Sequence, residues 1–548
     1  MKTSGATEAG GHHGARRLER LAVAAYIAIL VGASALPYAI AWRSTPPESV
    51  YTGAYDPASD DLAPYLARMR VGARGEWTYR SPYAPGIGPT VTIRPFYAAL
   101  GFLTGAVGAP LWAGYHAARL VLGVVSLVVI FLLARSVSRS RLERWAVFVL
   151  ASAGSGIGWM IGREGEAATW SYDLWVSELN AAHSLITSPH FPLSIVLMLA
   201  CLAAVARSLD RDRASLAGWG GTAFAFLALE HPYDDVVLAS ALAGFGIAAL
   251  VTARPPGRSL ARAALAFAAT ALPAVIWEIV SVRSDPSLAQ MGLAQPVGSP
   301  LSVVTGLGFL PLLALAGGTT LARRSTLGRI LISWCLVVPF LLILPFPFPR
   351  RLVIGWQVPL GTAAGLGLVR LLSPIRRDAA RVTATVAVLV LASLSTVDVF
   401  AYKVRSASQP ELGYRTWLPR EFVEVYAWLQ AHARPRAVVL GPYALSNFMP
   451  VYTDLCPYYG HWAETPDAPL RRRSVLEFYA PGTTDAWRSR FLVESGVEWV
   501  IAPRSGTLTQ SVVLDPRRID GLTRATRIGF LEIFRVEAAN ATRRTTDP

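Results

Sequence analysis

Three aspartates lie close together in the polar stretch that follows the first long apolar run of the chain. Asp56, Asp60 and Asp61 fall within six positions, and the last two directly precede a segment, Leu62–Gly72, that we expect to be helical. A carboxylate placed here can take a proton from a hydroxyl group as a general base, or bind a divalent cation. The alternative is structural, because aspartate is a common helix cap.

Two further groups of polar residues interrupt apolar sequence. The stretch 163–189 is acidic, and such a stretch is more often simply solvated. The run His231-Pro232-Tyr233-Asp234-Asp235 separates two apolar segments, where ionisable groups are costly unless they line a cavity. A tight turn is the alternative at this second position. The side chains that we expect to line a polar cavity are Glu178, His183, His231, Tyr233, Asp234 and Asp235.

Arg350 and Arg351 are the cations whose position is most informative. They follow a segment that alternates proline and phenylalanine, 345–349. A guanidinium group suits bidentate binding of phosphate, and a lipid-linked phosphate lies at the membrane interface, where these two side chains are expected. The alternative is that they extend toward lipid headgroups.

An aromatic and polar run, Tyr458–Thr465, stands near the C-terminal end of the chain. Its aromatic faces could form a platform for sugar rings, although a packed loop explains the run at least as well. Known chemical motifs are otherwise missing from the sequence. It contains no GxxxxGK[ST] loop for nucleotide phosphates, no HExxH, no GxSxG and no CxxC.

The composition excludes an ordinary soluble protein. Hydrophobic residues make up 53% of the 548 positions even without the 45 glycines, only 16% are charged, and the mean hydropathy is +0.39. Soluble domains average roughly 45–50% apolar and about 25% charged residues. The net charge of +15 comes largely from arginines in short loops between apolar runs, which is typical of membrane proteins rather than of nucleic-acid binding.

A membrane helix needs about 20 mostly apolar residues. Eleven segments meet this description: 21–42, 111–134, 143–162, 190–207, 215–230, 236–253, 262–282, 301–321, 328–346, 352–372 and 382–402. The shorter apolar piece 95–108 suits a re-entrant or interfacial segment. With the N-terminus inside, five arginine-bearing loops face the cytoplasm, as the positive-inside rule requires.

This orientation places two long loops, 43–110 and 163–189, and everything after 402 on the outer side. The tail has its own pattern of elements. Helical periodicity over Glu421–Ala433 alternates with short apolar runs such as Ala437–Leu440 and Glu498–Ala502. We therefore expect a cytoplasmic disordered N-terminus at 1–20, a transmembrane domain at 21–402, and a small α/β extracytoplasmic domain at 403–548.

This pattern resembles the GT-C superfamily of integral-membrane glycosyltransferases, which includes bacterial relatives of protein mannosyltransferase and aminoarabinose transferase. Asp60-Asp61 followed by Tyr65 resembles the acidic pair and tyrosine of that family's first outer loop. The second acid is Asp61 where the family often has glutamate. Further similarity follows in Gly75-Glu76-Trp77, Tyr83, Pro95, Gly101, His116 and Arg119.

The resemblance implies an inverting glycosyltransferase in the bacterial inner (plasma) membrane. It would move a sugar from a polyprenyl-phosphate carrier to an acceptor on the outer side, with membrane lipid and the donor as partners and without nucleic acid. Asp60 or Asp61 would act as the base, with Asp56 competing for that role, and Arg350 and Arg351 would hold the donor phosphate. It implies no required cofactor, although a divalent cation is compatible with it.

Two other classes of function fit a polytopic protein of this kind. A lipid or polysaccharide transporter would carry polar residues near the bilayer midplane, and few charges fall inside the predicted spans. A non-catalytic envelope assembly protein would not need outer acids together with outer arginines. We therefore expect the acids of the first outer loop and the arginines at 350 and 351 to meet in one outward-facing pocket.

Overall fold

The computed structural model describes residues 4–55, 59–84, 92–165, 169–284, 298–346, 348–407, 409, 413–504 and 518–537. The chain divides into two compact units. The first contains 1–37, 116–275 and 295–405, and the second contains 38–115, 276–294 and 406–548. The tail thus shares a unit with most of the first outer loop. The domain boundaries expected from the sequence stay a prediction.

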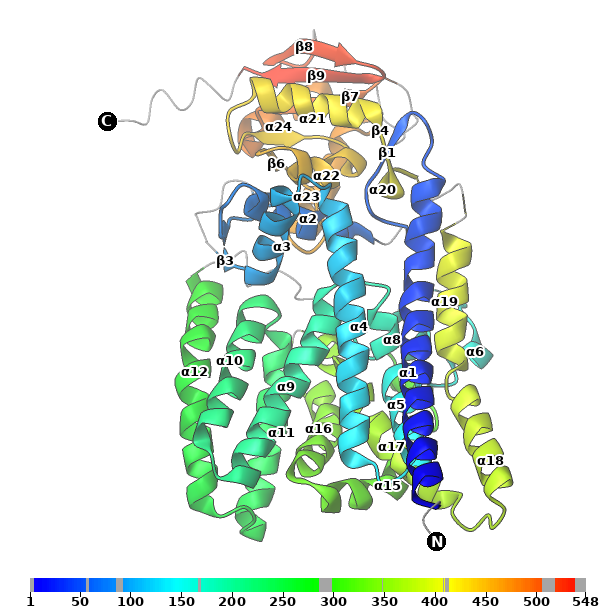
Figure 1. The fold of residues 1–548 in the computed structure, drawn as a ribbon. Helices are drawn as coiled ribbons and strands as arrows, with labels where there is room; N and C mark the ends of the chain where they lie inside the picture. The colour runs from blue at the N-terminus through cyan, green and yellow to red at the C-terminus, as the bar shows by residue number, and fades with distance from the viewer. Residues whose placement is uncertain are drawn as a thin grey trace. The chain divides into compact units, whose positions relative to one another are not determined.

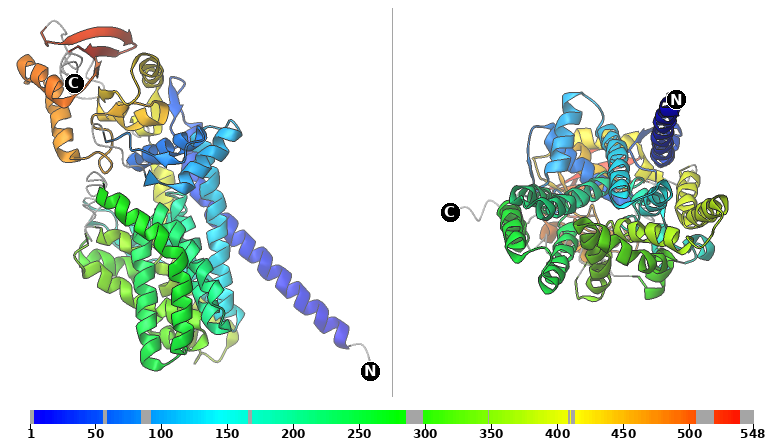
Figure 2. Two further views of the ribbon diagram at one scale, coloured as in Figure 1. Left: turned by 90° about the vertical axis from the view of Figure 1, so that its left-hand side faces the viewer. Right: turned by 60° about the horizontal axis from the view of Figure 1, so that its bottom comes forward.

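The first unit is helical, and Figures 1 and 2 show most of its long helices running alongside one another, whereas α1 leans away from them in the left view of Figure 2. Its helices, together with those that continue into the second unit, are α1 (Ser4–Arg43), α4 (Leu111–Val137), α5 (Arg141–Ala153), α6 (Gly158–Ile161), α7 (Tyr172–Trp175), α8 (Ala181–Ser184), α9 (His190–Arg211), α10 (Ala214–Glu230), α11 (Tyr233–Thr252), α12 (Gly257–Ser284), α14 (Pro300–Leu307), α15 (Leu310–Arg324), α16 (Thr326–Ile343), η3 (Pro349–Val353), α17 (Gln357–Leu371), α18 (Asp378–Leu391) and α19 (Leu394–Ser406).

Every apolar segment expected to span a membrane contains helix in the structure, although some are interrupted: 143–162 consists of α5, a non-helical stretch and the short α6. Within the described ranges, seven helices are long and apolar enough to cross a membrane, or nine if two bent pairs each count as one span. The bent pairs are α14–α15 and α18–α19. The two remaining expected spans coincide with α5 and α10, which have 13 and 17 residues. The protein is a multi-pass membrane protein, and the count of eleven stays a prediction.

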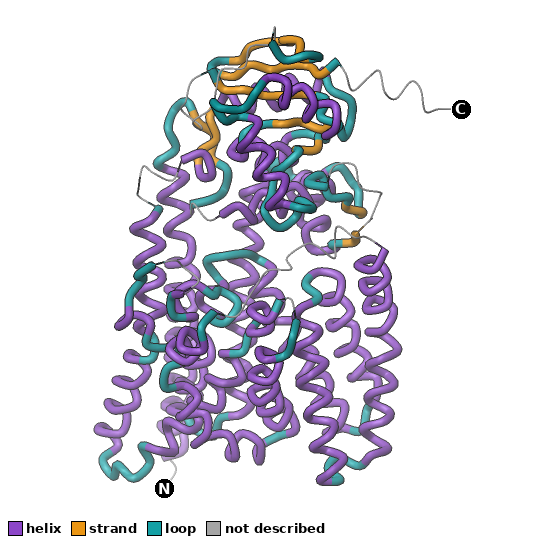
Figure 3. Tube along the Cα trace, turned by 180° about the vertical axis from the view of Figure 1, so that it is seen from behind, coloured by secondary structure: helices purple, strands orange, loops and turns teal. Residues whose placement is uncertain are grey.

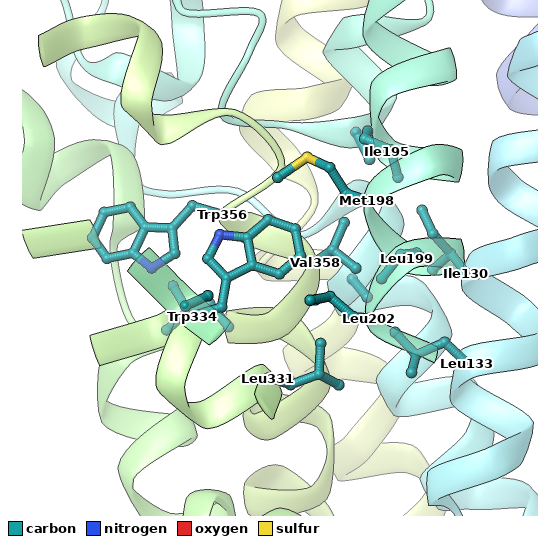
Figure 4. Packing of buried hydrophobic residues seen from close by; sticks show 14 of the residues in the cluster. Ile130, Leu133, Ile195, Met198, Leu199, Leu202, Leu331, Trp334, Trp356 and Val358 are labelled. Atoms are coloured by element: carbon teal, nitrogen blue, oxygen red, sulfur yellow. The ribbon is translucent and has the colours of Figure 1, made fainter. Parts of the chain in front are cut away.

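One large hydrophobic core holds the first unit together. Helices α15 and α5 both pack against α17, and α10 packs against α9. Figure 4 shows Trp334 of α16 and Trp356 near Met198 and Leu202 of α9, and Trp334 is completely buried. The α17 helix is buried along almost its whole length, so it is the central helix against which its neighbours pack.

All nine described strands belong to the second unit, as the strand colouring of Figure 3 helps to show. Five form a mixed sheet in the order β6-β5-β7-β9-β8, in which β5 is parallel to β6 and β7 and antiparallel pairs join β7, β9 and β8. Their bounds are β5 (Val438–Leu440), β6 (Cys456–Pro457), β7 (Trp499–Pro503), β8 (Leu522–Ile528) and β9 (Leu531–Val536).

Helices surround this sheet and connect it to the first outer loop. The remaining elements of the unit are β1 (Ser49–Tyr51), η1 (Ser59–Asp61), α2 (Leu62–Ala73), β2 (Thr78–Tyr79), β3 (Thr92–Ile93), α3 (Pro95–Ala106), α20 (Gly413–Thr416), β4 (Trp417–Pro419), α21 (Arg420–His432), α22 (Tyr443–Tyr452), α23 (Ala468–Phe478) and α24 (Asp485–Ser495). Strand β1 pairs with β4, and β2 pairs with β3.

The first outer loop and the tail share one hydrophobic core. Leu66 and Met69 of α2 belong to the same buried cluster as Phe448 of α22 and Ile501 of β7. Helix α2 packs against both α3 and α22. The amphipathic face of α2 is therefore buried against residues almost 400 positions later in the chain, and the acids at its start are fixed by the tail.

Glycines allow the close contact between α2 and α3. A Cβ atom at Gly101 would lie 1.9 Å from the backbone oxygen of Met69, and one at Gly72 would lie 2.0 Å from that of Ala98. No side chain fits at either distance, so the two helix backbones touch. The apolar piece expected to be re-entrant or interfacial is thus α3, a 12-residue helix packed on α2.

Replacing Gly101 by alanine is expected to push α3 away from α2 and to destabilise the protein by about 1–3 kcal/mol, a typical cost of overpacking. The measurement is the thermal unfolding temperature of the purified protein in detergent. Gly246→Ala is the matched control, because a Cβ atom at that position meets nothing within 4 Å. Equal unfolding temperatures for the two variants would show that the close contact is absent.

Candidate active site

Asp60 lies on the short turn η1 and is held by two side chains of the tail. Its Oδ1 atom is 2.9 Å from Nε of Arg415, and its Oδ2 atom accepts a hydrogen bond of 2.9 Å from the hydroxyl group of Tyr443. The side chain is 15% exposed. A carboxylate that is this buried needs such partners to remain charged.

Asp61 has a different environment. Its side chain is 51% exposed, and its Oδ1 atom is 3.2 Å from Nε2 of the buried His461. Nδ1 of His461 accepts hydrogen bonds from the backbone amides of Ala463 and Glu464. The ring proton of a neutral imidazole must therefore sit on Nε2, which donates to Asp61 and orients it toward solvent.

The alternative that Asp60 merely caps the helix does not agree with its contacts, because its Oδ2 atom bonds to Tyr443 and its Oδ1 atom accepts no hydrogen bond from the residues that the structure describes. Asp61 is the residue that precedes α2, but its side chain makes no capping hydrogen bond with the helix. Both carboxylates instead point to side chains of the tail, namely Arg415, Tyr443 and His461. Asp56, the third candidate base, lies outside the described residues.

The environment of Asp60 changes its acidity. Burial raises the pKa of this carboxyl, and the lowering effects of Arg415 and of the Tyr443 hydrogen bond offset that rise only in part. Burial and the neighbouring Asp60 raise the pKa of Tyr443, so this hydroxyl keeps its proton and remains a donor. A carboxylate with a raised pKa is a stronger base than an ordinary aspartate, which suits proton abstraction near neutral pH.

A cavity of about 550 Å³ opens beside Asp60. Its walls come from the turn η1, from α20, from the start of α22, from the loop that follows β6, and from the second half of α23 with the residues that follow it. The polar and aromatic side chains that line it are Asp60, Arg415, Tyr443, Tyr459, Trp462, Arg472 and Tyr479. The residues of the run Tyr458–Thr465 therefore have two roles. Tyr459 and Trp462 line the cavity, whereas His461 and Glu464 are buried and form hydrogen bonds with Asp61 and Arg68 respectively.

In the first unit, the structure brings together three of the expected segments. The guanidinium group of Arg351 lies 5.2 Å from the ring centre of Tyr233, and its Nη1 atom is 3.9 Å from Oε1 of Glu178. The guanidinium group of Arg350 lies 4.9 Å from the ring centre of Trp175. These contacts orient two cations of η3 beside the turn 231–235 and the acidic loop.

The other residues expected to line a cavity, His183, His231, Asp234 and Asp235, also belong to the first unit. His231 Nδ1 is 2.6 Å from Oδ1 of Asp234, and the His231 ring lies 5.1 Å from that of His190. His183 is buried in α8, and Asp235 is in the first turn of α11. Whether these side chains line a cavity stays a prediction, as does a meeting of Arg350 and Arg351 with the acids of the second unit.

Metal ligands do not gather in the parts of the chain that the structure describes. No group of three or more histidine, cysteine, aspartate or glutamate side chains could hold an ion there. Asp60 is instead paired with the cation Arg415. A divalent cation at this site stays a prediction.

Neither a protein-family model nor a curated protein matches the sequence. Solved structures do match. The archaeal oligosaccharyltransferase AglB from Archaeoglobus fulgidus, in complex with an inhibitory peptide and a dolichol-phosphate, is similar over 90% of this chain and 70% of its own, with a TM-score of 0.54 and 12% identity. The Archaeoglobus fulgidus oligosaccharyltransferase with Zn and sulfate is similar over 88% and 68%, with a TM-score of 0.51 and 12% identity.

This chain has the GT-C fold. The resemblance expected from the acidic pair and the apolar spans is thereby confirmed at the level of the fold. ArnT from Cupriavidus metallidurans in the apo state also matches, over 94% of this chain and 99% of its own, with a TM-score of 0.49 and 15% identity.

Several residues around the acidic pair of this GT-C fold were not found from the sequence. Arg415 lies in a four-residue helix without a periodic pattern, and nothing in its neighbourhood marks it. Tyr443 carried a usable signal, because it closely follows β5, a strand of the parallel part of the sheet. Ligand sites in open α/β sheets form at the carboxyl ends of such strands.

Replacing Arg415 by glutamine is expected to raise the pKa of Asp60 further, because the cation that lowers it is removed. A carboxyl group whose folded pKa lies above its unfolded value stabilises the fold at low pH and loses this contribution as the pH rises through the folded pKa. The unfolding temperature of Arg415→Gln should therefore be close to that of the unmodified protein near pH 4 and clearly lower near pH 7.

The control for this measurement is Arg434→Gln, which breaks the pair of the half-exposed Arg434 with Glu498 in the same unit. Exposed pairs contribute little, so this variant should show a small difference that hardly changes with pH. A constant difference for Arg415→Gln across the same range would contradict the assigned charge interaction.

Proposed function

We propose that this protein is a glycosyltransferase that moves a sugar from a polyprenyl-phosphate carrier to an acceptor on the outer side of the membrane. The observation that carries the proposal is the Asp60–Asp61 turn, whose two carboxylates are oriented by Arg415, Tyr443 and His461 on a GT-C fold. The solved AglB structure with the same fold is an oligosaccharyltransferase bound to a dolichol-phosphate, which supports the class of donor.

The reaction is a single displacement at the anomeric carbon of the donor sugar. A carboxylate of the Asp60–Asp61 pair takes the proton of the acceptor hydroxyl as its oxygen forms the new bond. The bond between the anomeric carbon and the phosphate oxygen breaks, and the phosphate leaves with the electron pair. One displacement inverts the anomeric configuration, so the proposed enzyme is inverting.

The two carboxylates have complementary properties for this step. Asp61 is the more accessible, because half of its side chain is exposed and His461 orients it. Burial raises the pKa of Asp60, so its carboxylate is a stronger base than that of an ordinary aspartate. The leaving phosphate needs fixed cations, and Arg350 and Arg351 are proposed to supply them, since their stacking on Trp175 and Tyr233 orients both guanidinium groups in advance.

The double variant Asp60→Asn, Asp61→Asn is expected to lower kcat by about 10²- to 10⁴-fold, the usual contribution of a general base. The assay incubates the purified protein with labelled polyprenyl-phosphate sugars and candidate acceptors and detects the product by mass. The single variants then show which carboxylate accepts the proton. Asp378→Asn is the control, because that side chain is 86% exposed and far along the chain. Full activity of the double variant would overturn the assigned base.

The double variant Arg350→Gln, Arg351→Gln is expected to weaken binding of the polyprenyl-phosphate donor by about 10- to 100-fold, as the loss of charge-assisted hydrogen bonds predicts. The measurement is the Kd for the lipid phosphate in detergent. Arg376→Gln, at an exposed position between α17 and α18, is the matched control. If the Arg350→Gln, Arg351→Gln double variant bound the donor as tightly as the Arg376→Gln control, these two arginines would not bind the donor phosphate.

The proposed orientation is testable by labelling with a membrane-impermeant maleimide in bacterial spheroplasts. Leu470→Cys places a thiol where the side chain is 65% exposed on α23, and it should be labelled from outside. Asp378→Cys should be labelled only after lysis. Background is low because Cys201 and Cys456 are buried and Cys335 is partly so. The reverse pattern would place the acidic pair in the cytoplasm.

A further inference from the structure

The cavity beside Asp60 is larger than a proton transfer requires. Its volume of about 550 Å³ falls within the range of about 300–1,000 Å³ that is usual for small-molecule sites. It lies where β5 and β6, which are parallel, end: Pro442 and Tyr443 follow β5, and Tyr459 follows β6. Open α/β sheets bind ligands at such an edge.

The walls of the cavity combine flat aromatic faces with leucine and valine side chains. The rings of Tyr443 and Tyr459 lie 5.1 Å apart at an angle of 31°, and the side chain of Trp462 is 41% exposed. A large exposed aromatic side chain beside a cavity is available to a ligand. Such surfaces suit the apolar face of a sugar ring, whose hydroxyl groups can bond to the carboxylate and the hydroxyl of the same wall.

Helix α23 adds a cation to this cavity. Arg472, Val475, Leu476 and Tyr479 line it, and their spacing of three, four and seven residues places them on one face of the helix. The charges of Asp60 and Arg415 compensate each other. Among the residues that the structure describes, no carboxylate pairs with Arg472. The cavity therefore carries one cation in excess.

The arginines on either side of Arg472 have other roles. The guanidinium group of Arg471 lies 4.8 Å from the ring centre of Tyr458 and donates a hydrogen bond of 3.1 Å to its backbone oxygen. Arg471 thus fixes the helix to the loop after β6. Arg473 is exposed and does not line the cavity. Of these three consecutive arginines, Arg471 holds the helix to the loop, Arg472 lines the cavity, and Arg473 is solvated and can serve as a control position.

We propose that this cavity is a binding subsite for an acidic sugar, a pyranose ring that carries a carboxylate or a phosphate group. Trp462 and Tyr459 hold the ring, and Arg472 binds the anionic substituent. This assignment rests on the proposed glycosyl transfer and deepens it, because a sugar bound beside Asp60 belongs to the acceptor. The acceptor of the reaction is then an acidic glycan rather than a neutral one.

The test measures binding to the full-length protein in detergent by calorimetry, with no donor present. The probes are a neutral glucose disaccharide, a glucuronate-containing disaccharide, a glucose disaccharide phosphorylated on its 6-hydroxyl group, and inorganic phosphate alone. At least one of the two acidic disaccharides should bind about 10- to 100-fold more tightly than the neutral one, and which of them does so identifies the substituent. Inorganic phosphate should bind more weakly than the acidic disaccharides, because it cannot use the aromatic walls.

Variants at Arg472 and Trp462, with a control at Arg473, test the role of each part of the subsite. Arg472→Gln should remove the preference for acidic sugars, whereas Arg473→Gln should retain it. Trp462→Ala should weaken binding of every disaccharide by roughly 10-fold, and Trp462→Phe, which keeps a ring, should weaken it less. Far-UV circular dichroism and unfolding temperature confirm that each variant is folded before it is compared.

Equal binding of acidic and neutral disaccharides, or equal effects of the two arginine variants, would overturn the proposal. So would phosphate binding as tight as that of the phosphorylated disaccharide. Because no donor is present, these results do not depend on transfer. If the acidic disaccharides show no preference, the acidic subsite is wrong, but the proposed glycosyl transfer is not affected. If the protein prefers acidic sugars but shows no transferase activity, only the proposed transfer reaction is contradicted.

Discussion

The pairing of Asp60 with Arg415 is the interaction on which the proposed chemistry depends. It joins the first outer loop to the tail, and the Tyr443 hydroxyl, 383 positions from Asp60, completes it. A largely buried carboxylate without such partners would take up a proton or destabilise the fold. The shared hydrophobic core between α2 and α22 brings these groups within bonding distance. The tail is therefore part of the site and not an appended module.

The first unit uses a different means to fix its charged residues. Leu352 and Val353, which directly follow Arg351, are completely buried, so η3 is fixed by packing and its arginines extend onto the rings of Trp175 and Tyr233. Arg351 also forms an ion pair with Glu178, in which Nη1 and Oε1 are 3.9 Å apart. Guanidinium groups oriented in this way are suited to bidentate binding of a phosphate.

Local patterns predicted much of this architecture. Strands β5 and β7 and helix α21 lie where apolar patterns predicted them, because each buries side chains in a core, and α2 covers the segment expected to be helical after the acidic pair. The fold class was predicted by composition and by the acidic pair. Local patterns could not show that α2 packs on α22, that β1 pairs with β4, or that Arg415 faces Asp60, because those contacts join residues hundreds of positions apart. The sequence did not single out Arg472 either. It is one of three adjacent arginines, and which of them lines the cavity depends on which face of α23 is turned toward the cavity.

A double-mutant cycle on Asp60 and Arg415 tests the central claim most directly. Unfolding free energies would be measured for Asp60→Asn, for Arg415→Gln and for the double variant at neutral pH. If the loop and the tail are joined by this pair, the double variant loses less than the sum of the single losses, with a coupling of about 1–3 kcal/mol. Additive losses would mean that the two residues do not interact, and that the tail does not hold the acidic turn in place.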